Sequence, residues 1–310
     1  AAEKFFFNNK FMDVLSALPH YFKEADQETY GSDRRGQRQA RSIALFQCLS
    51  SLLAMRKNAD DLILNIRAKG LQSTGSLSER REVTLEIHVF TDGINMISPV
   101  LNMFKESISV HTFELDNSRH LPLKARDHLV ENGHAYDLCL YMEDDLIIRD
   151  SEFLDKQIWF IKESEHRAVL MPHRTEWVPN GNGQRLLVDG PLKKEFIERF
   201  YTPKCNAAQG TFKGRGVIFD QSDNPHSGLF CISGVQAKQL ATLDQPVHGF
   251  IGPLETAATL TVLRRYLVLK PAWKDRDFLW IEHGHPSFRG YCSKWSKLDD
   301  SVEINENERP

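Results

Sequence analysis

Apolar segments of strand length alternate in this chain with amphipathic segments of helix length. Residues 82–93, 109–116 and 136–148 have the apolar, β-branched and aromatic content of strands. Residues 99–107 and 121–134, which lie between these strands, read as helices. Strands that are joined through a helix pair in parallel by a right-handed crossover. The alternation therefore predicts an α/β fold with a mostly parallel central sheet flanked by helices.

The chain is predicted to form one domain. Its 310 residues, 41% of them hydrophobic, can bury a full core, and no repeat or linker-like break in composition divides them. We expect residues 35–290 to form the core, residues 1–34 an N-terminal helical extension and residues 291–310 a charged tail. The aromatic-rich stretch 3–24 is interpreted as a helix that serves packing.

Residues 180–228 are rich in Gly, Asn and Ser, which predicts long surface loops. Residues 206–228 have few apolar anchors among many turn residues. We therefore expect low local stability there, as a mobile lid over a substrate would need.

Charge and composition exclude several classes of protein. A net charge of −3 without a block of Lys or Arg argues against a nucleic-acid partner. No apolar run approaches the roughly 18 residues of a membrane span, and no signal peptide or Asn-x-Ser/Thr site is present. Five scattered cysteines suggest neither a zinc knuckle nor a disulfide framework. These features predict a cytoplasmic protein, or one associated with a membrane; a Golgi lumenal domain whose anchor has been removed is the alternative.

Three adjacent acids, Glu143, Asp144 and Asp145, interrupt the apolar run of residues 136–148. In parallel sheets, ligands gather beyond the carboxyl ends of the strands, where Asp92 also lies. Three neighbouring carboxylates in a crevice need a compensating cation. Oxygen ligands suit Mg²⁺ or Mn²⁺, which often complete their shells with substrate phosphates. The acids thus predict a metal-bound nucleotide or other diphosphate; a solvated acidic turn is the alternative.

The stretch "YDLCLYMEDDLII" resembles the DxD-type strand end of GT-A-fold glycosyltransferases, which have a Rossmann-type core and use nucleotide-sugar donors. Other segments follow in the order of that family: the helix "RSIALFQCLSSL", the strand end "VFTDG", the helix "LPLKARDHL" and, later, "GPLETAATL". The resemblance spans roughly residues 35–290. Glu143 stands where a strict DxD motif has its first Asp, which leaves open which acid touches the metal.

The resemblance implies roles for the acids. Asp145 would bind the metal, and Glu143 and Asp144 would hold the ribose or a metal-bound water. Asp92 would lie near the base or the ribose of the donor.

Four more charged residues are candidates for the donor pocket. In the family that this chain resembles, basic residues at the positions of Lys124 and Arg126 approach the donor; a solvated helix face is the alternative. Arg174 and Glu176 end the next expected strand and would form a pair that shapes the sugar pocket. An ordinary surface ion pair is the alternative for these two.

Glu255 is the candidate general base. It occupies the third position of a helix that begins with Gly252 and Pro253, where a Glu also stabilises the helix start. In the family, an acid on such a helix often removes the proton of the acceptor. His283 and His285 are two residues apart on an extended segment, so both would point the same way, and the resemblance implies that one of them completes the metal shell. Hydrogen bonds to backbone or water are the alternative for the histidines.

These features favour a metal-dependent glycosyltransferase that moves a sugar from a nucleotide-sugar donor to an acceptor hydroxyl on a glycan, a lipid-linked molecule or another compound. If Glu255 is the base, a single displacement inverts the anomeric centre. A metal-dependent nucleotidyl or phosphoryl transferase is a second hypothesis, although no Gly-rich phosphate loop follows the first expected strand. A non-catalytic carbohydrate-binding module of the same fold is a third.

Overall fold

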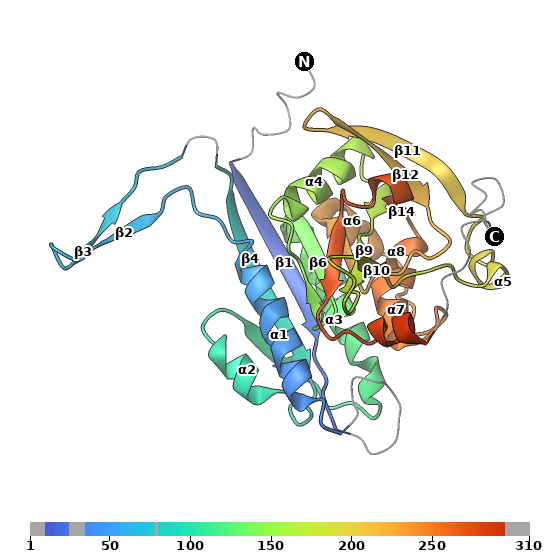
Figure 1. The fold of residues 1–310 in the computed structure, drawn as a ribbon, viewed down its shortest axis with the longest axis horizontal. Helices are drawn as coiled ribbons and strands as arrows, with labels where there is room; N and C mark the ends of the chain where they lie inside the picture. The colour runs from blue at the N-terminus through green and yellow to red at the C-terminus, as the bar shows by residue number, and fades with distance from the viewer. Residues whose placement is uncertain (1–9, 25–34, 78–79, 295–310) are drawn as a thin grey trace.

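The computed structural model describes residues 10–24, 35–77 and 80–294. Its centre is a five-stranded sheet with the strand order β13, β6, β1, β4, β5 (Figure 1). All neighbours pair in parallel except β13, which runs antiparallel to β6. The strands are β1 (Phe11–Pro19), β4 (Glu82–Thr91), β5 (Ser109–Thr112), β6 (Leu138–Met142) and β13 (Leu229–Ser233). The predicted α/β fold with a mostly parallel central sheet is confirmed.

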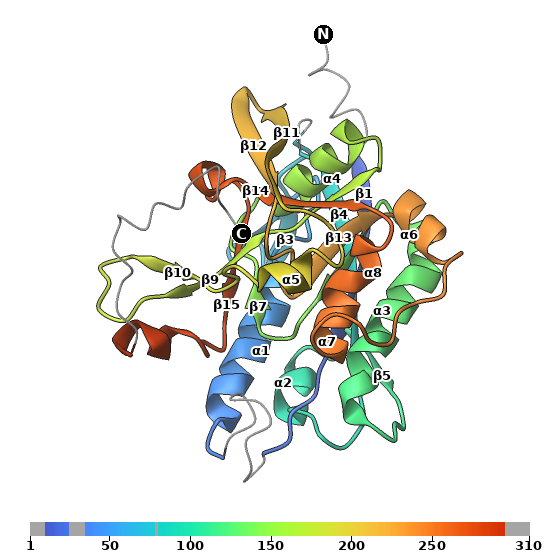
Figure 2. The same ribbon diagram turned by 90° about the vertical axis from the view of Figure 1, so that its right-hand side faces the viewer.

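Helices cover both faces of this sheet, as Figure 2 shows for α1 on one side and α3 and α6 on the other. One apolar cluster joins the first face to α1, α2 and α4, and a second joins the other face to α3, α6 and the segment that begins with α7. The helices are α1 (Arg38–Leu53), α2 (Ser98–Met103), α3 (Leu121–Asn132), α4 (Phe153–Glu163), α5 (Lys194–Ile197), α6 (Gly234–Leu240), α7 (Pro253–Glu255) and α8 (Thr261–Leu263). Burial on both faces explains why β6 is apolar throughout and why Ser233 is the one polar residue of β13.

The N-terminal segment is not the helical extension that we predicted. Residues 11–19 form β1, the middle strand of the central sheet, which pairs with β4 on one side and β6 on the other. A short apolar run fits a buried helix as well as a buried strand, and pairing with residues distant in sequence decides between them. Most of the expected charged tail, residues 295–310, lies outside the described residues.

Two smaller four-stranded sheets adjoin the central one. One has the order β10, β9, β15, β7, and the other β11, β12, β14, β8. Residues 168–177, the predicted strand that carries Arg174 and Glu176, are divided between the two sheets, because β8 pairs with β14 whereas β9 pairs with β15. Their strands are β7 (Leu146–Ile147), β8 (Ala168–Leu170), β9 (His173–Trp177), β10 (Arg185–Leu187), β11 (Lys204–Phe212), β12 (Arg215–Gln221), β14 (Leu267–Pro271) and β15 (Trp280–His283).

Part of the Gly-rich region forms strands where surface loops were predicted. Residues 204–221 form the antiparallel β11–β12 hairpin, which pairs with β14, so most of the expected lid is a sheet. Its small residues have a packing reason at Gly210, where a β-carbon would come within 2.9 Å of the ring of Trp159. The Gly and Asn residues of this region predicted turns, but they could not show that β12 pairs with β14, which lies about 50 residues later in the sequence.

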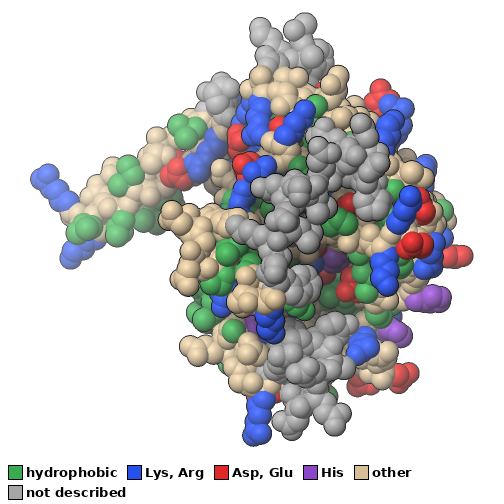
Figure 3. Space-filling model, turned by 45° about the vertical axis from the view of Figure 1, so that its right-hand side comes forward, with side chains coloured by type: hydrophobic (Ala, Val, Ile, Leu, Met, Phe, Trp, Pro, Cys, Tyr) green, Lys and Arg blue, Asp and Glu red, His purple; other side chains and the backbone are tan. Residues whose placement is uncertain are grey.

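A two-stranded arm, β2 (Leu62–Asn65) and β3 (Gly70–Ser73), projects away from the body of the molecule (Figures 1 and 3). Several of its apolar side chains are exposed, among them Ile66, which is 80% exposed. Within the described residues, no helix has both the length and the apolar character needed to cross a membrane.

Candidate active site

The three acids follow β6 directly, and β7 follows them, so they form the turn between two buried strands. Glu143, Asp144 and Asp145 are only 7%, 7% and 8% exposed. This burial contradicts the alternative of a solvated acidic turn. Since β1, β4 and β6 are parallel, the segments that follow β1 and β4 emerge at the same edge of the sheet.

Arg41, from α1, neutralises two of the acids. Its guanidinium donates to Asp145 Oδ2 at 2.7 Å and to both oxygens of Asp144 at 2.7 and 2.9 Å. Asp144 Oδ2 also lies 2.5 Å from Nδ1 of His20, the residue after β1. The other ring nitrogen, Nε2, accepts a bond from the Ile97 N–H at 2.9 Å, so Nδ1 donates to Asp144. Asp144 is therefore fixed in place by three hydrogen bonds, two from Arg41 and one from His20.

Asp145 faces His283, at the end of β15. His283 Nε2 is 3.5 Å from Asp145 Oδ2, and His283 Nδ1 is 2.6 Å from Glu176 Oε1. Burial lowers the pKa of His283, but the charge of Asp145 and the bonds to both acids outweigh it and raise this pKa to about 9. His285 instead bonds Gln37 at 3.2 Å. Of the two histidines, His283 is thus the one that contacts the acidic triplet.

Glu143 is the least neutralised of the acids. Its Oε2 is 3.6 Å from Arg174, its Oε1 is 3.8 Å from His226 Nε2, and no described residue gives that Oε1 a hydrogen bond. Burial, with added repulsion from Asp145 and Glu255, outweighs the attraction of Arg174 and raises the pKa of Glu143 to about 8. Gly228 makes room for the carboxylate, because a β-carbon there would lie 2.7 Å from Glu143 Oε2.

Arg174 and Glu176 do not form the predicted pair, and neither lies on the surface. They are 8% and 1% exposed. Arg174 donates to Asp189 at 2.8 Å and faces Glu143. Glu176 is hydrogen-bonded to His283, and it accepts hydrogen bonds from the backbone N–H groups of residues 287–289. The two side chains belong to separate parts of one buried charge network, which extends through Asp189 to Lys270, 3.6 Å away.

Glu255 ends the short helix α7, where its Oε2 accepts a bond from the Gly252 N–H at 3.1 Å. It is half-buried, and it lies close enough to Glu143 to raise the pKa of that acid. A π-helical turn, residues 256–260, follows it directly; such turns are frequent at functional sites. Glu255 thus stabilises the start of α7 through Oε2, and this bond does not use its Oε1.

The remaining predicted donor-binding residues are engaged differently. Asp92 accepts bonds from Ile94 and Asn95 in the turn after β4; burial raises its pKa, but these bonds outweigh it and lower the pKa overall. Lys124 is exposed, with Nζ 6.0 Å from the ring centroid of Phe113. Arg126 is not on a solvated face: it is 1% exposed and donates to Asp127, Pro246 O and Thr261. These bonds give Arg126 a structural role between α3 and the segment around α8.

Asp145 and His283 could hold a divalent cation, which would have to displace the proton that the raised pKa of His283 retains at neutral pH. Their facing atoms are 3.5 Å apart, and two ligands each about 2.1 Å from one ion lie about 3 Å apart. Glu176 orients the imidazole, as a carboxylate often does behind a metal-binding histidine. However, Arg41 and Arg174 already compensate the acids, so charge repulsion alone does not require a metal.

No protein-family model matches this chain, and no curated protein matches it. Among solved structures, it is similar to Staphylococcus aureus TarS 1–349, both alone and in complex with UDP, at 13% identity and TM-scores of 0.43 and 0.44. Each match covers 87% of this chain and 60% of the other. The chain thus spans about three fifths of the length of those structures. A similarity of this size establishes neither a family nor an activity.

Cavity volume does not locate the site. A cavity of about 1130 Å³ lies between α4 and the β11–β12 hairpin, and one of about 320 Å³ lies beside His173 and Lys270. Neither is lined by the acidic triplet. The site is instead marked by buried charges that gather at the carboxyl ends of the parallel strands.

Sequence reasoning missed five members of the charge network: His20, Arg41, Asp189, His226 and Lys270. A signal existed only for Arg41, a charged residue within the apolar face of an amphipathic helix.

Arg41→Met is expected to destabilise the protein by about 3–5 kcal/mol at neutral pH, because it leaves two buried carboxylates without their main cation. Urea unfolding measures this loss. Arg38→Met, at an exposed position on the same helix, is the control and should change stability by no more than about 1 kcal/mol. Equal losses in the two variants would contradict the role given to Arg41.

Proposed function

We propose that this protein is a glycosyltransferase that moves a sugar from a nucleotide-sugar donor to a hydroxyl group of an acceptor. The observation that carries the proposal is the pairing of Asp145 with His283, 3.5 Å apart, among buried acids at the carboxyl edge of a parallel sheet. The order of the flanking segments, described above as GT-A-like, supports it. Nucleotide ligands of α/β sheets bind at this edge.

In this proposal, Asp145 and His283 hold Mn²⁺ or Mg²⁺ through one oxygen and one nitrogen. A cation bound there would neutralise the charge of the departing diphosphate. The mixed ligand set favours Mn²⁺, because Mg²⁺ prefers oxygen ligands.

The roles that we assign to Asp144, Glu143 and Asp92 follow from the hydrogen bonds that each one makes or lacks. Asp144 is held by Arg41 and His20, so it positions the turn and keeps Arg41 beside Asp145. Glu143 has an oxygen without a hydrogen bond from the described residues, and this oxygen is available to a ribose hydroxyl of the donor. Asp92, at the next strand end, is assigned to the base or ribose.

Glu255 is assigned as the general base. Its Oε2 accepts the hydrogen bond from the Gly252 N–H at the helix start, and its Oε1 would accept the proton of the acceptor hydroxyl. In a single displacement, the acceptor oxygen forms a bond to the anomeric carbon as the bond to the diphosphate breaks, which inverts that centre, and Glu255 takes the proton of the hydroxyl. Arg174, fixed by Asp189, is assigned to the sugar pocket beside Glu143.

A panel of nucleotide sugars tests this function. With Mn²⁺, a true donor at 100 times its dissociation constant should stabilise the protein by about 2.7 kcal/mol, and prolonged incubation should release nucleoside diphosphate. Release of pyrophosphate from nucleoside triphosphates would instead show nucleotidyl transfer. Stabilisation by free saccharides, with no turnover of any donor, would show a binding module.

A further inference from the structure

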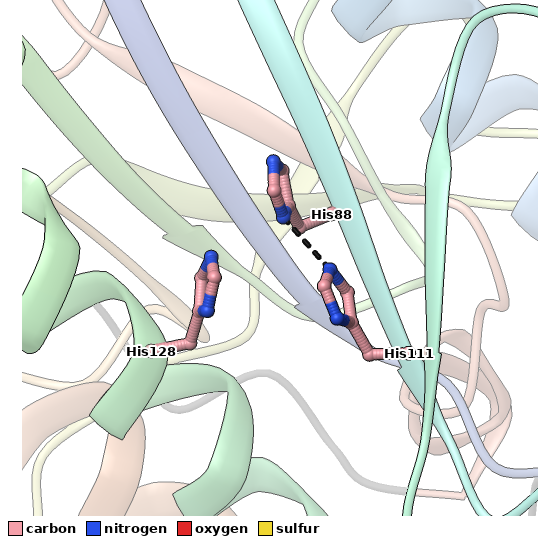
Figure 4. A group of neighbouring side chains, drawn as sticks. All are labelled: His88, His111 and His128. Atoms are coloured by element: carbon pink, nitrogen blue, oxygen red, sulfur yellow. Dashed lines mark hydrogen bonds between the residues drawn. The ribbon is translucent and has the colours of Figure 1, made fainter.

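Three histidines gather on the sheet face that α3 covers, and none of them belongs to the acidic site. His88 lies on β4, His111 on the edge strand β5 and His128 on α3, and all three are partly buried (Figure 4). In the β4–β5 pair, His111 is opposite Phe90, so His88 and His111 are diagonal neighbours on one face. Three segments that are separate in sequence thus bring imidazoles to one place.

The ring nitrogens converge. His88 Nδ1 and His111 Nε2 are 2.8 Å apart, and one nitrogen from each of the three rings lies within 4.8 Å of the others. The ring centroids are 4.8–5.2 Å apart. Among the described residues, these histidines are the one group of three His, Cys, Asp or Glu side chains whose ligand atoms are arranged closely enough to hold a metal ion.

Their surroundings favour the neutral form of His111 and His128, which is the form that binds a metal. Burial and the neighbouring His88 lower the pKa of His111. Burial, with His88 and His111, lowers the pKa of His128 to about 4. At neutral pH, a metal ion that binds His111 and His128 would therefore release few protons from these two rings.

A carboxylate stands behind the first ring. Glu86 Oε2 is 3.5 Å from His88 Nε2, and Tyr136 donates its hydroxyl to Glu86 Oε2 at 2.9 Å. A metal-binding histidine commonly directs its second nitrogen to a carboxylate in this way. The arrangement leaves His88 Nδ1 directed toward His111.

We propose that His88, His111 and His128 form a site for a divalent transition metal of the zinc class, separate from the cation site at Asp145. Zn–N bonds of about 2.0–2.1 Å require nitrogens about 3.4 Å apart. The nitrogens of His88 and His111, now 2.8 Å apart, would therefore separate slightly, and the wider separations, of up to 4.8 Å, would shorten. Three imidazoles select Zn²⁺, Co²⁺ or Ni²⁺ over Mg²⁺ and Mn²⁺. The ion would join β4, β5 and α3 and keep a fourth position for water.

Zinc titration of untagged, EDTA-treated protein tests the site. Isothermal calorimetry should find one zinc per chain, and zinc should raise the melting temperature. His111→Gln and His128→Gln should abolish both effects, whereas Glu86→Gln should weaken zinc binding about 10- to 100-fold. His134→Gln, at an exposed histidine, should change nothing.

Two further measurements keep the result separate from the acidic site and from folding. Asp145→Asn should retain the zinc effect, and Co²⁺ should give the strong visible bands of a tetrahedral site only when the three histidines are present. Circular dichroism of the metal-free variants verifies that they fold. If the parent protein binds no zinc at tenfold excess, or if His111→Gln and His128→Gln bind it as the parent does, the proposal is wrong.

Discussion

Asp145→Asn is expected to remove the stabilisation that Mn²⁺ adds to nucleoside-diphosphate binding, and to leave the protein folded. The amide keeps the volume of the carboxylate and can still accept the bond from Arg41. It removes the negative oxygen that faces His283 at 3.5 Å. A nucleoside diphosphate at 100 times its dissociation constant stabilises the parent protein by about 2.7 kcal/mol in total, and the variant should lose the part of this that depends on Mn²⁺. Thermal shifts with and without Mn²⁺, over a panel of nucleoside diphosphates, measure it.

A histidine pair provides the matched control. His283→Gln should weaken the Mn²⁺ effect as Asp145→Asn does, whereas His285→Gln, whose ring bonds Gln37 instead of an acid, should leave it unchanged. If Asp145→Asn and the parent protein respond equally to Mn²⁺, the cation does not bind at this residue. Sugar transfer would then depend on Arg41 and Arg174 as the cations beside the diphosphate.

Glu255→Gln is expected to reduce sugar transfer by about 10²- to 10⁴-fold, because loss of a general base typically has this effect. The Gln side chain can still accept the Gly252 N–H bond, so the helix start should persist. Donor and Mn²⁺ should bind nearly as in the parent protein. Transfer rates at saturating donor, together with thermal shifts, separate the two effects.

Glu131→Gln, at an exposed acid on α3, is the control for this experiment and should transfer sugar at the parent rate. Near-parental transfer by Glu255→Gln would restrict Glu255 to its helix-start role and point to another base or a retaining mechanism. Loss of donor binding would place Glu255 in the donor pocket instead.

The sequence predicted the parts of the fold that local pattern controls. Alternation of polar and apolar residues identified β4, a continuous apolar run identified β6, and helical spacing identified α1 and α3. It failed where pairing between distant segments decides the outcome. Residues 11–19 became β1 because β4 and β6 flank them, and residues 204–221 became a hairpin that pairs with β14.

The candidate site was predictable in its acids and less so in their partners. Glu143, Asp144 and Asp145 stood out because three charges interrupt an apolar run. Their compensation by Arg41 involves residues 103 and 104 positions away in sequence, which no local pattern reports. The choice of His283 over His285 likewise needed the geometry, since both lie at the same strand end.

The place of β1 in the central sheet has a consequence for synthesis of the chain. Phe11 pairs with Glu82, and Val14 pairs with Leu138, so both neighbours of β1 are made long after it. At about 5–20 residues per second, the ribosome needs roughly 6–25 s to reach β6. Because β4 (Glu82–Thr91) is made before β6, until β6 emerges β1 can pair with β4 alone, on one of its two edges. A chaperone that binds extended apolar segments is therefore expected to hold residues 11–19 of the nascent chain until β6 emerges.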